Sequence, residues 1–432
     1  MLLYCASLII PGFYATEVGI GTKVIGTVMV VSRLFDAAID PVIGHLSDRT
    51  SQLGWSRRPW LVAGAIVSSI AVAFLYAPSP GVGAGYYLAW TLCLYLGWTM
   101  AIIPYDAWGA DISREYAERS RIFTFRSFAY YFGSLLFLGS PFLGGAGSHT
   151  FNAEVLQFNA RLVAVLFLIS VPLALRFAPH GRVCGSAVRI GLWSIVGELR
   201  RNLPMLRFLL SYSISGISLG VFLALSYIYV VNYLRLPEAF PVILVGYAVA
   251  NLVAVPPWLW IIRRIGRHRA WAVGVFLDAL FYPPLAFLSP GPASFLPALI
   301  LIGCSGFADA VSRVASDAIL GDIVDYAELK TGKSRTANYY AVKSLVTKTN
   351  VAIGGGLAFL SIGWFGFDPM RTVNTPHAVH GFLFTLLIVP SILYVLAGIL
   401  MWRFPINQRR QNLIRRRLEA RASREADRIE RA

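Results

Sequence analysis

The chain has 432 residues and is strongly apolar, with 56% hydrophobic and 14% charged residues. A typical soluble domain carries about 25% charged residues, so this composition excludes an ordinary soluble protein. The formal net charge is +16. Because the basic residues gather in short segments between long apolar stretches, we interpret them as a membrane-topology signal and expect no nucleic-acid partner.

About twelve apolar stretches, each long enough to cross a hydrocarbon core, follow one another along the chain. Their approximate cores are 1–16, 21–46, 60–77, 86–108, 122–143, 157–177, 204–233, 239–262, 270–288, 294–318, 338–363 and 379–402. Lipid offers a backbone no hydrogen-bond partners, so such stretches must be helical. The sequence therefore predicts an all-α membrane protein with about twelve transmembrane helices.

The predicted helices divide into two halves of six. The arginine-rich turn at 44–60, which ends in Trp, follows the second helix, and a similar turn at 258–271 follows the second helix of the second half. Parallel halves around a central site are typical of one large class of transporters. We expect an N-terminal half, a central cytoplasmic loop, a C-terminal half and a basic cytoplasmic tail, at 1–177, 178–203, 204–403 and 404–432.

Positive charge lies on one side of the predicted helices. The segment 78–85 carries no charge and 144–156 carries only Glu154, whereas every segment after an even-numbered helix holds at least three arginines or lysines. This bias predicts that both termini are cytoplasmic in a cell inner membrane. The tail is either a solvated helix, which we favour, or a helix that lies on anionic membrane lipid. Met1 has no charged flank, so we expect the first helix to be truncated.

Two carboxylates lie within the second apolar stretch. Asp36 and Asp40 are four residues apart, which places them on one helix face. Charge inside a bilayer costs at least about 2.5 kcal/mol, so such residues usually face a polar pathway. Two close carboxylates in a low dielectric cannot both ionise cheaply, so one holds a proton or both bind a cation.

Three sequence blocks carry a resemblance to a known family. The blocks RLFDAAIDPVIGHLSDRTSQLGWSRRPW (33–60), IPYDAWGADISREYAERSRIFTFRSF (103–128) and GDIVDYAELKTGKSRTANYYAVKSLVTKTNVAIGGG (321–356) resemble the glycoside–pentoside–hexuronide:cation symporters. This is the melibiose permease family, within the major facilitator superfamily. The resemblance covers essentially the whole chain. It implies the major facilitator fold and a monomeric symporter, without an enzyme activity or cofactor, that moves a sugar or glycoside with a coupling cation.

The resemblance also implies a cation site. Asp36 and Asp40 match the family's two cation-site carboxylates, and Thr99 matches the hydroxyl that completes the site. Sodium-using members place Asn before the second Asp, where this chain has Ile39. We therefore favour H⁺ over Na⁺ as the coupling ion, with Na⁺ at Asp36 and Asp40 left open and no other metal indicated. The structural alternative is that one carboxylate only pairs with Arg33.

The substrate side follows the family less closely. Arg126 and Lys348 match the family's fifth-helix Arg and eleventh-helix Lys near the substrate, with an interhelical salt bridge as the alternative for each. The first-helix sugar-binding Asp has no counterpart. The fourth-helix Asp aligns with Ile102, and Asp106 lies one turn later. Trp108 has a ring that a sugar could stack on, although packing is the commoner role of a membrane aromatic residue.

Charged residues at the predicted cytoplasmic ends resemble an inside gate. The turn after the second helix is similar to the major facilitator signature loop, and the tenth helix ends in two carboxylates. We expect gating roles for Asp48, Arg49, Arg57, Arg58, Asp322 and Asp325, with a solvated loop as the alternative. Asp309 and Arg313, four residues apart in the tenth helix, are expected to pair, and Gly354–Gly356 to allow close helix packing.

Two other functions were weighed. A transporter of the same fold that moves a lipid or other amphiphile would explain the displaced sugar carboxylates. A membrane prenyltransferase would use two Asp pairs, Asp36 with Asp40 and Asp322 with Asp325, to hold magnesium on a diphosphate. The number of helices, the repeat of the halves and the depth of Asp36 argue against this enzyme.

Overall fold

The computed structural model describes residues 9–52, 57–112, 136–143, 150–177, 202–331, 336–371 and 373–414, with single positions or pairs at 129, 132–133, 416–418 and 420. For several residues inside these ranges, only the backbone is described. Over the described part of the chain the fold is helical throughout. The predicted spans 1–16 and 122–143 lie partly outside these residues, as does most of the predicted central loop.

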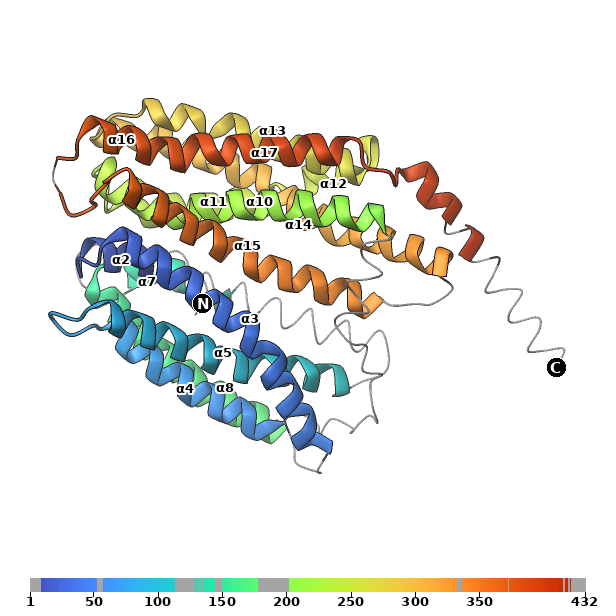
Figure 1. The fold of residues 1–432 in the computed structure, drawn as a ribbon, viewed down its shortest axis with the longest axis horizontal. Coiled ribbons are helices and arrows are strands. Elements are labelled where there is room, and N and C mark those ends of the chain that lie inside the picture. Colours follow the sequence, from blue (N-terminus) through green and yellow to red (C-terminus); the bar gives the residue numbers. More distant parts are fainter. Residues whose placement is uncertain are drawn as a thin grey trace.

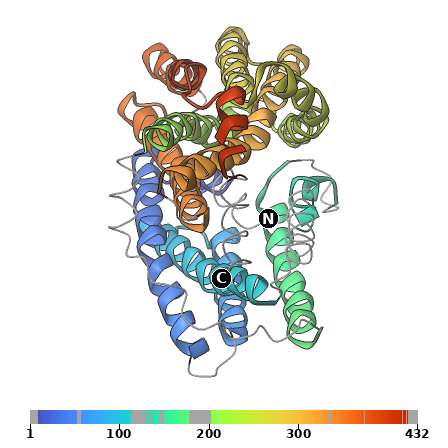
Figure 2. The ribbon, with the colours of Figure 1, turned by 90° about the vertical axis from the view of Figure 1, so that its right-hand side faces the viewer.

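The first layer of the molecule is formed by the N-terminal helices, as Figure 1 and Figure 2 show. These are α2 (Ile10–Thr16), α3 (Thr22–Gln52), α4 (Arg58–Tyr76), α5 (Ala84–Ile112), α7 (Ser140–Leu143) and α8 (Ala153–Phe177). Their axes run roughly side by side. The arginine-rich turn lies at the end shown on the right in Figure 1.

The second layer is formed by the C-terminal helices (Figure 1). These are α10 (Leu203–Ile228), η1 (Tyr229–Tyr233), α11 (Ala239–Val253), α12 (Val255–Ile265), α13 (Arg267–Phe281), η2 (Pro283–Phe287), η3 (Pro292–Ser294), α14 (Phe295–Thr331), α15 (Thr336–Trp364), α16 (Pro376–Leu383), η4 (Phe384–Ile388) and α17 (Val389–Trp402). Asn202 caps α10 by accepting from the Met205 backbone N–H at 3.2 Å.

Eight helices of the described part are long and apolar enough to cross a membrane, or nine if α11 and α12 form one bent span. The bend is 43°, and Pro256 and Pro257 at the start of α12 explain it, because proline removes a helical hydrogen bond and clashes with the preceding turn. The charged helix α3 is not among the eight. An all-α membrane protein is therefore confirmed.

The two layers touch through glycines in α3 and α15. A Cβ on Gly26 would lie 2.7 Å from the carbonyl oxygen of Gly356 and 2.8 Å from the Leu360 nitrogen, so the two backbones are in direct contact. A Cβ on Gly363 would lie 2.4 Å from Lys23 Cγ. These positions lie at the end opposite the arginine-rich turns, which is the end predicted to face outside.

The predicted close packing at Gly354–Gly356 is confirmed. A Cβ on Gly354 would lie 2.2 Å from the carbonyl oxygen of Ile217 in α10, and one on Gly356 would lie 2.5 Å from Val30 Cγ2 in α3. Small residues allow membrane helices to approach closely where apolar burial offers little driving force. The helix α15 is thus held against both halves.

Candidate functional site

The predicted cation-site residues come together between α3 and α5. Thr99 Oγ1 lies 2.9 Å from Asp40 Oδ1 and 3.1 Å from Asp36 Oδ1, and both contacts join residues about 60 positions apart. Thr99 is fully buried and Asp36 is 3% exposed, whereas Asp40 is half-buried. Asp40 lies nine residues before Arg49, or about 14 Å along the helix axis. The site is therefore near the middle of the membrane.

The three oxygen atoms share one hydroxyl hydrogen. A threonine hydroxyl donates a single hydrogen bond, so Thr99 satisfies one carboxylate oxygen at a time. The other contact is then between two acceptors, unless a proton or a cation lies between them. Acceptor oxygens held this close together can take up a proton or a cation.

Two prolines leave backbone oxygens near the same place. Pro104 lies inside α5 and has no N–H for the carbonyl of Met100, which follows Thr99. Pro41 lies inside α3 and likewise has no N–H for the carbonyl of Ala37, between the two aspartates. Carbonyls that lack their helical partner are available to other donors or to a cation.

Arg33 pairs with Asp36, as the structural alternative expected. Its Nη1 donates to Asp36 Oδ2 at 3.1 Å, and the two side chains are 11% and 4% exposed. The guanidinium carbon also lies 5.6 Å from the centre of the Tyr95 ring. A buried ion pair of this kind fixes the position of the Asp36 carboxylate and still leaves Asp36 Oδ1 on the Thr99 side.

The predicted gate residues of the N-terminal half lie where α3 ends and α4 begins, at the side predicted to be cytoplasmic. Arg49 is exposed in the last turn of α3, and Arg57 and Arg58 begin α4. The Arg58 guanidinium carbon lies 5.5 Å from the centre of the Trp108 ring, and Trp108 is 6% exposed. Trp108 therefore packs against a basic residue at this end.

Four predicted site residues cannot be placed at side-chain level. Arg126 lies outside the described residues altogether. Asp48, Asp106 and Lys348 lie in α3, α5 and α15, but their side chains are outside the described part of the structure.

The acidic residues at the inner end of α14 contact other parts of the C-terminal half. Arg267, the first residue of α13, forms a salt bridge with Asp322. Gln411, in the tail, donates to Asp325 Oδ2 at 2.6 Å. The contacts given for these two carboxylates thus hold the C-terminal half and its tail together.

Sequence reasoning missed two charged groups. Asp278 lies in α13 and is 1% exposed, and Ser305 donates to its Oδ1 at 3.0 Å. Lys343 in α15 pairs with Asp317 in α14, and its ammonium lies 5.4 Å from the centre of the Tyr212 ring. A lone acid within an apolar span was a sufficient signal for Asp278.

Two packed helical layers with buried carboxylates are the architecture expected of a membrane transporter, and the family assignment agrees. The chain belongs to the MFS/sugar transport protein family, whose model matches residues 1–408. The resemblance to the glycoside symporters is thereby confirmed, and so is the major facilitator fold.

Known proteins agree with this assignment. The chain is 23% identical to a glucuronide carrier protein homologue of Escherichia coli (strain K12), over 94% of this chain and 89% of the relative. It is 20% identical to a sodium-dependent lysophosphatidylcholine symporter of Danio rerio, over 91% and 80% of the two chains. The crystal structure of the nucleoside transporter NupG superposes with a TM-score of 0.66 at 12% identity, over 93% of this chain and 97% of the other.

Proposed function

We propose that this protein is a proton-coupled symporter of a sugar or glycoside, and that Asp36, Asp40 and Thr99 form its coupling site. It works as a monomer in the inner membrane with both termini in the cytoplasm. The observation that carries the proposal is the contact of one buried hydroxyl with two carboxylates near mid-depth. Ionisable residues at this depth are energetically costly and usually have a functional role.

The chemistry favours a proton over sodium. A sodium ion needs several oxygen ligands, and Ile39 stands where sodium-using relatives of the glycoside symporter family have an amide. A proton needs only one carboxylate oxygen and an acceptor, and Thr99 lies within hydrogen-bond distance of both aspartates. The carbonyls of Ala37 and Met100 are the ligands that would allow sodium instead.

Alternating access follows from how the halves meet. The glycine contacts between α3 and α15 close the outer end, as expected of a state that is open to the cytoplasm. In the reverse state these contacts separate and the inner charged residues come together. Arg126, Lys348, Asp106 and Trp108 are our candidates for the substrate side. Our candidates for the gate are Asp48, Arg49, Arg57, Arg58, Asp322 and Asp325.

A lipid or other amphiphile is the second candidate substrate. The similarity to a lysophosphatidylcholine symporter favours it. The coupling site is the same under either substrate.

The test is solute-driven proton movement in lightly buffered, de-energised cells that make this protein. Glycosides, pentosides and uronides are added in turn, followed by amphiphiles, and the external pH is recorded. Alkalinisation with one of them names the substrate class. No pH response with any sugar, in cells where the protein is inserted, would favour sodium or an amphiphile.

Asp40→Asn then tests the coupling site. One charge moved across 100 mV is worth about 2.3 kcal/mol, so one proton accumulates a neutral glycoside about 50-fold. Asp40→Asn should abolish accumulation and keep exchange of solute across the membrane. Asp368→Asn, an exposed carboxylate in an outer loop, is the matched control. Full accumulation by Asp40→Asn refutes the assignment.

A further inference from the structure

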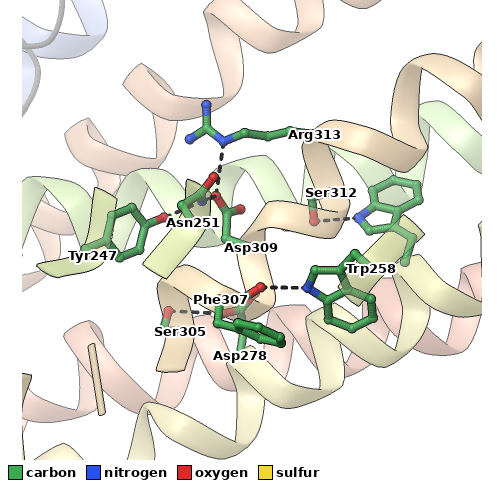
Figure 3. Close-up of polar contacts among 10 residues, drawn as sticks. Tyr247, Asn251, Trp258, Asp278, Ser305, Phe307, Asp309, Ser312 and Arg313 are labelled. Atoms are coloured by element: carbon green, nitrogen blue, oxygen red, sulfur yellow. Dashed lines mark hydrogen bonds and ion pairs between the residues drawn. The ribbon is translucent and has the colours of Figure 1, made fainter. Parts of the chain in front are cut away.

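The C-terminal half holds a polar cluster at mid-depth that the coupling site does not include (Figure 3). Asp309 in α14 is 7% exposed, and its Oδ2 accepts from Tyr247 Oη at 3.1 Å and from Asn251 Nδ2 at 3.3 Å, both in α11. Arg313 Nε lies 3.4 Å from the same oxygen, which confirms the predicted pair. Ser305 lies one turn before Asp309 on the same face, and it bonds Asp278.

This arrangement repeats that of the coupling site. In each half, an aspartate between the second and fourth membrane helices accepts from a hydroxyl on the other helix, at 3.1 Å in both cases. Each of these aspartates also pairs with an arginine on its own helix, Arg33 with Asp36 and Arg313 with Asp309. The carboxylate lies on the second helix of the first half and on the fourth helix of the second half. The second carboxyl differs as well: it is Asp40 on the same helix in one half and Asp278 on a neighbouring helix in the other.

The Asp278 carboxyl lacks what an ionised group needs. It is 1% exposed, it lies nine residues or about 14 Å along α13 from Arg269, and its Oδ2 makes no hydrogen bond within the described structure. Its one described donor is the neutral hydroxyl of Ser305. A carboxylate buried in this way is costly, whereas a carboxylic acid is not, because the acid carries no charge.

We propose that Asp278 is a second proton-binding site of this transporter. The proton is carried on a carboxyl oxygen of Asp278, and on release it passes to water and leaves a carboxylate that Ser305 continues to bond. Arg313 is about half exposed (47%) and pairs with Asp309, so the cluster reaches the surface of the helix bundle at Arg313. Charged residues at this depth usually face a polar pathway, and we assign this pathway as the route of the proton to water.

The charge of the neighbouring groups sets how easily this proton leaves. Asp309 and Arg313 are the charged pair of this cluster, so separation of the pair during the transport cycle would change how firmly Asp278 holds its proton. The polar and titratable groups of the whole cluster come from α11, the end of α13, α14 and α17. Ser305 contacts Asp278, Tyr247, Asn251 and Arg313 contact Asp309, and Tyr282 stacks edge-on against Tyr394.

The proton itself is tested first, by infrared spectroscopy of the purified full-length protein in lipid. A protonated carboxyl gives a carbonyl-stretching band that a carboxylate lacks. The proposed coupling site contributes a band of its own when it is protonated, so the Asp278 component is identified by difference. We expect this component in the wild type, its loss in Asp278→Asn and its retention in Asp40→Asn and Asp368→Asn. Ser305→Ala should move the band to higher frequency, because the acid loses a hydrogen-bond donor; this variant serves if Asp278→Asn does not fold.

The exchange of the proton is tested next. The band should fall as the pH is raised and return when it is lowered. An unchanged band in Asp278→Asn, or a wild-type band that ignores pH while the protein stays folded, overturns the proposal. These spectra need no substrate, so they stand or fall separately from the proposed symport.

A transport measurement distinguishes a coupling role from a structural one. If Asp278 cycles its proton, Asp278→Asn should flatten the pH dependence of uptake and keep solute exchange. A wild-type pH profile in this variant overturns the coupling role.

Discussion

The contact between Gly26 and Gly356 offers a direct test of alternating access. A single methyl group at position 26 would lie 2.7 Å from the Gly356 carbonyl oxygen and 2.8 Å from the Leu360 nitrogen. Both are backbone atoms of α15, which cannot rotate away as a side chain can. Gly26→Ala therefore forces the outer ends of α3 and α15 apart.

The effect of Gly26→Ala on the conformational equilibrium depends on which state contains the steric clash. Overpacking of this kind costs about 1–3 kcal/mol, and it is felt only in the state in which the outer ends are closed. The gain in helix propensity from Gly to Ala is the same in both states and cancels. The ratio of outward-open to inward-open molecules should therefore rise by about 5-fold to about 150-fold.

The assay is the distance between spin labels on the outer loops of the two halves. Ser79→Cys and Val373→Cys place labels on exposed residues of the N-terminal and C-terminal halves, in a background without native Cys5, Cys93, Cys184 and Cys304. Gly26→Ala should shift the distribution toward longer distances.

The control is Gly303→Ala, in α14, where an added Cβ meets nothing within 4 Å. It should leave the distances as they are in the wild type. A wild-type distribution in Gly26→Ala would mean that the α3–α15 contact does not separate during the cycle, and it would refute the reasoning.

Two further predictions concern ion choice and the tail. Ile39→Asn supplies an amide oxygen beside Asp40, so sodium should begin to stimulate uptake; no response to sodium in an inserted, active variant would argue against a cation site there. Gln411→Leu removes a hydrogen bond to a carboxylate, worth about 1.5–3 kcal/mol. The tail should then detach about 13-fold to about 150-fold more often, and trypsin should cut at Arg409 and Arg410 faster. Unchanged cleavage would show that Gln411 does not hold the tail.

Much of this fold was predictable because the membrane leaves few choices. An apolar stretch of sufficient length must become a helix, so the order of the helices can be read from the sequence. The Asp309–Arg313 and Arg33–Asp36 pairs were also predictable, since helical spacing alone brings their side chains together. The bend between α11 and α12 follows from Pro256 and Pro257 in the same way.

Contacts between distant segments were not predictable from spacing. The pairing of Arg267 with Asp322 joins residues 55 positions apart, and that of Gln411 with Asp325 joins residues 86 apart. The approach of Thr99 to the two aspartates was expected only from the family resemblance. Asp278 was missed because the prediction relied on pairs of charged residues at helical spacing. Its hydrogen-bond partner is the neutral Ser305 on another helix.

The number of carboxyl clusters that bind a coupled proton sets the maximal accumulation of the solute. With one coupled proton, 100 mV supports about 50-fold accumulation of a neutral solute, and with two coupled protons about 2,500-fold, because the free energies add. If Asp278 holds its proton permanently and has only a structural role, the limit of about 50-fold applies. Steady accumulation above about 50-fold at a clamped 100 mV, without a pH gradient, therefore requires a second coupled charge. Loss of that excess in Asp278→Asn, and of all accumulation in Asp40→Asn, would assign one proton to each half.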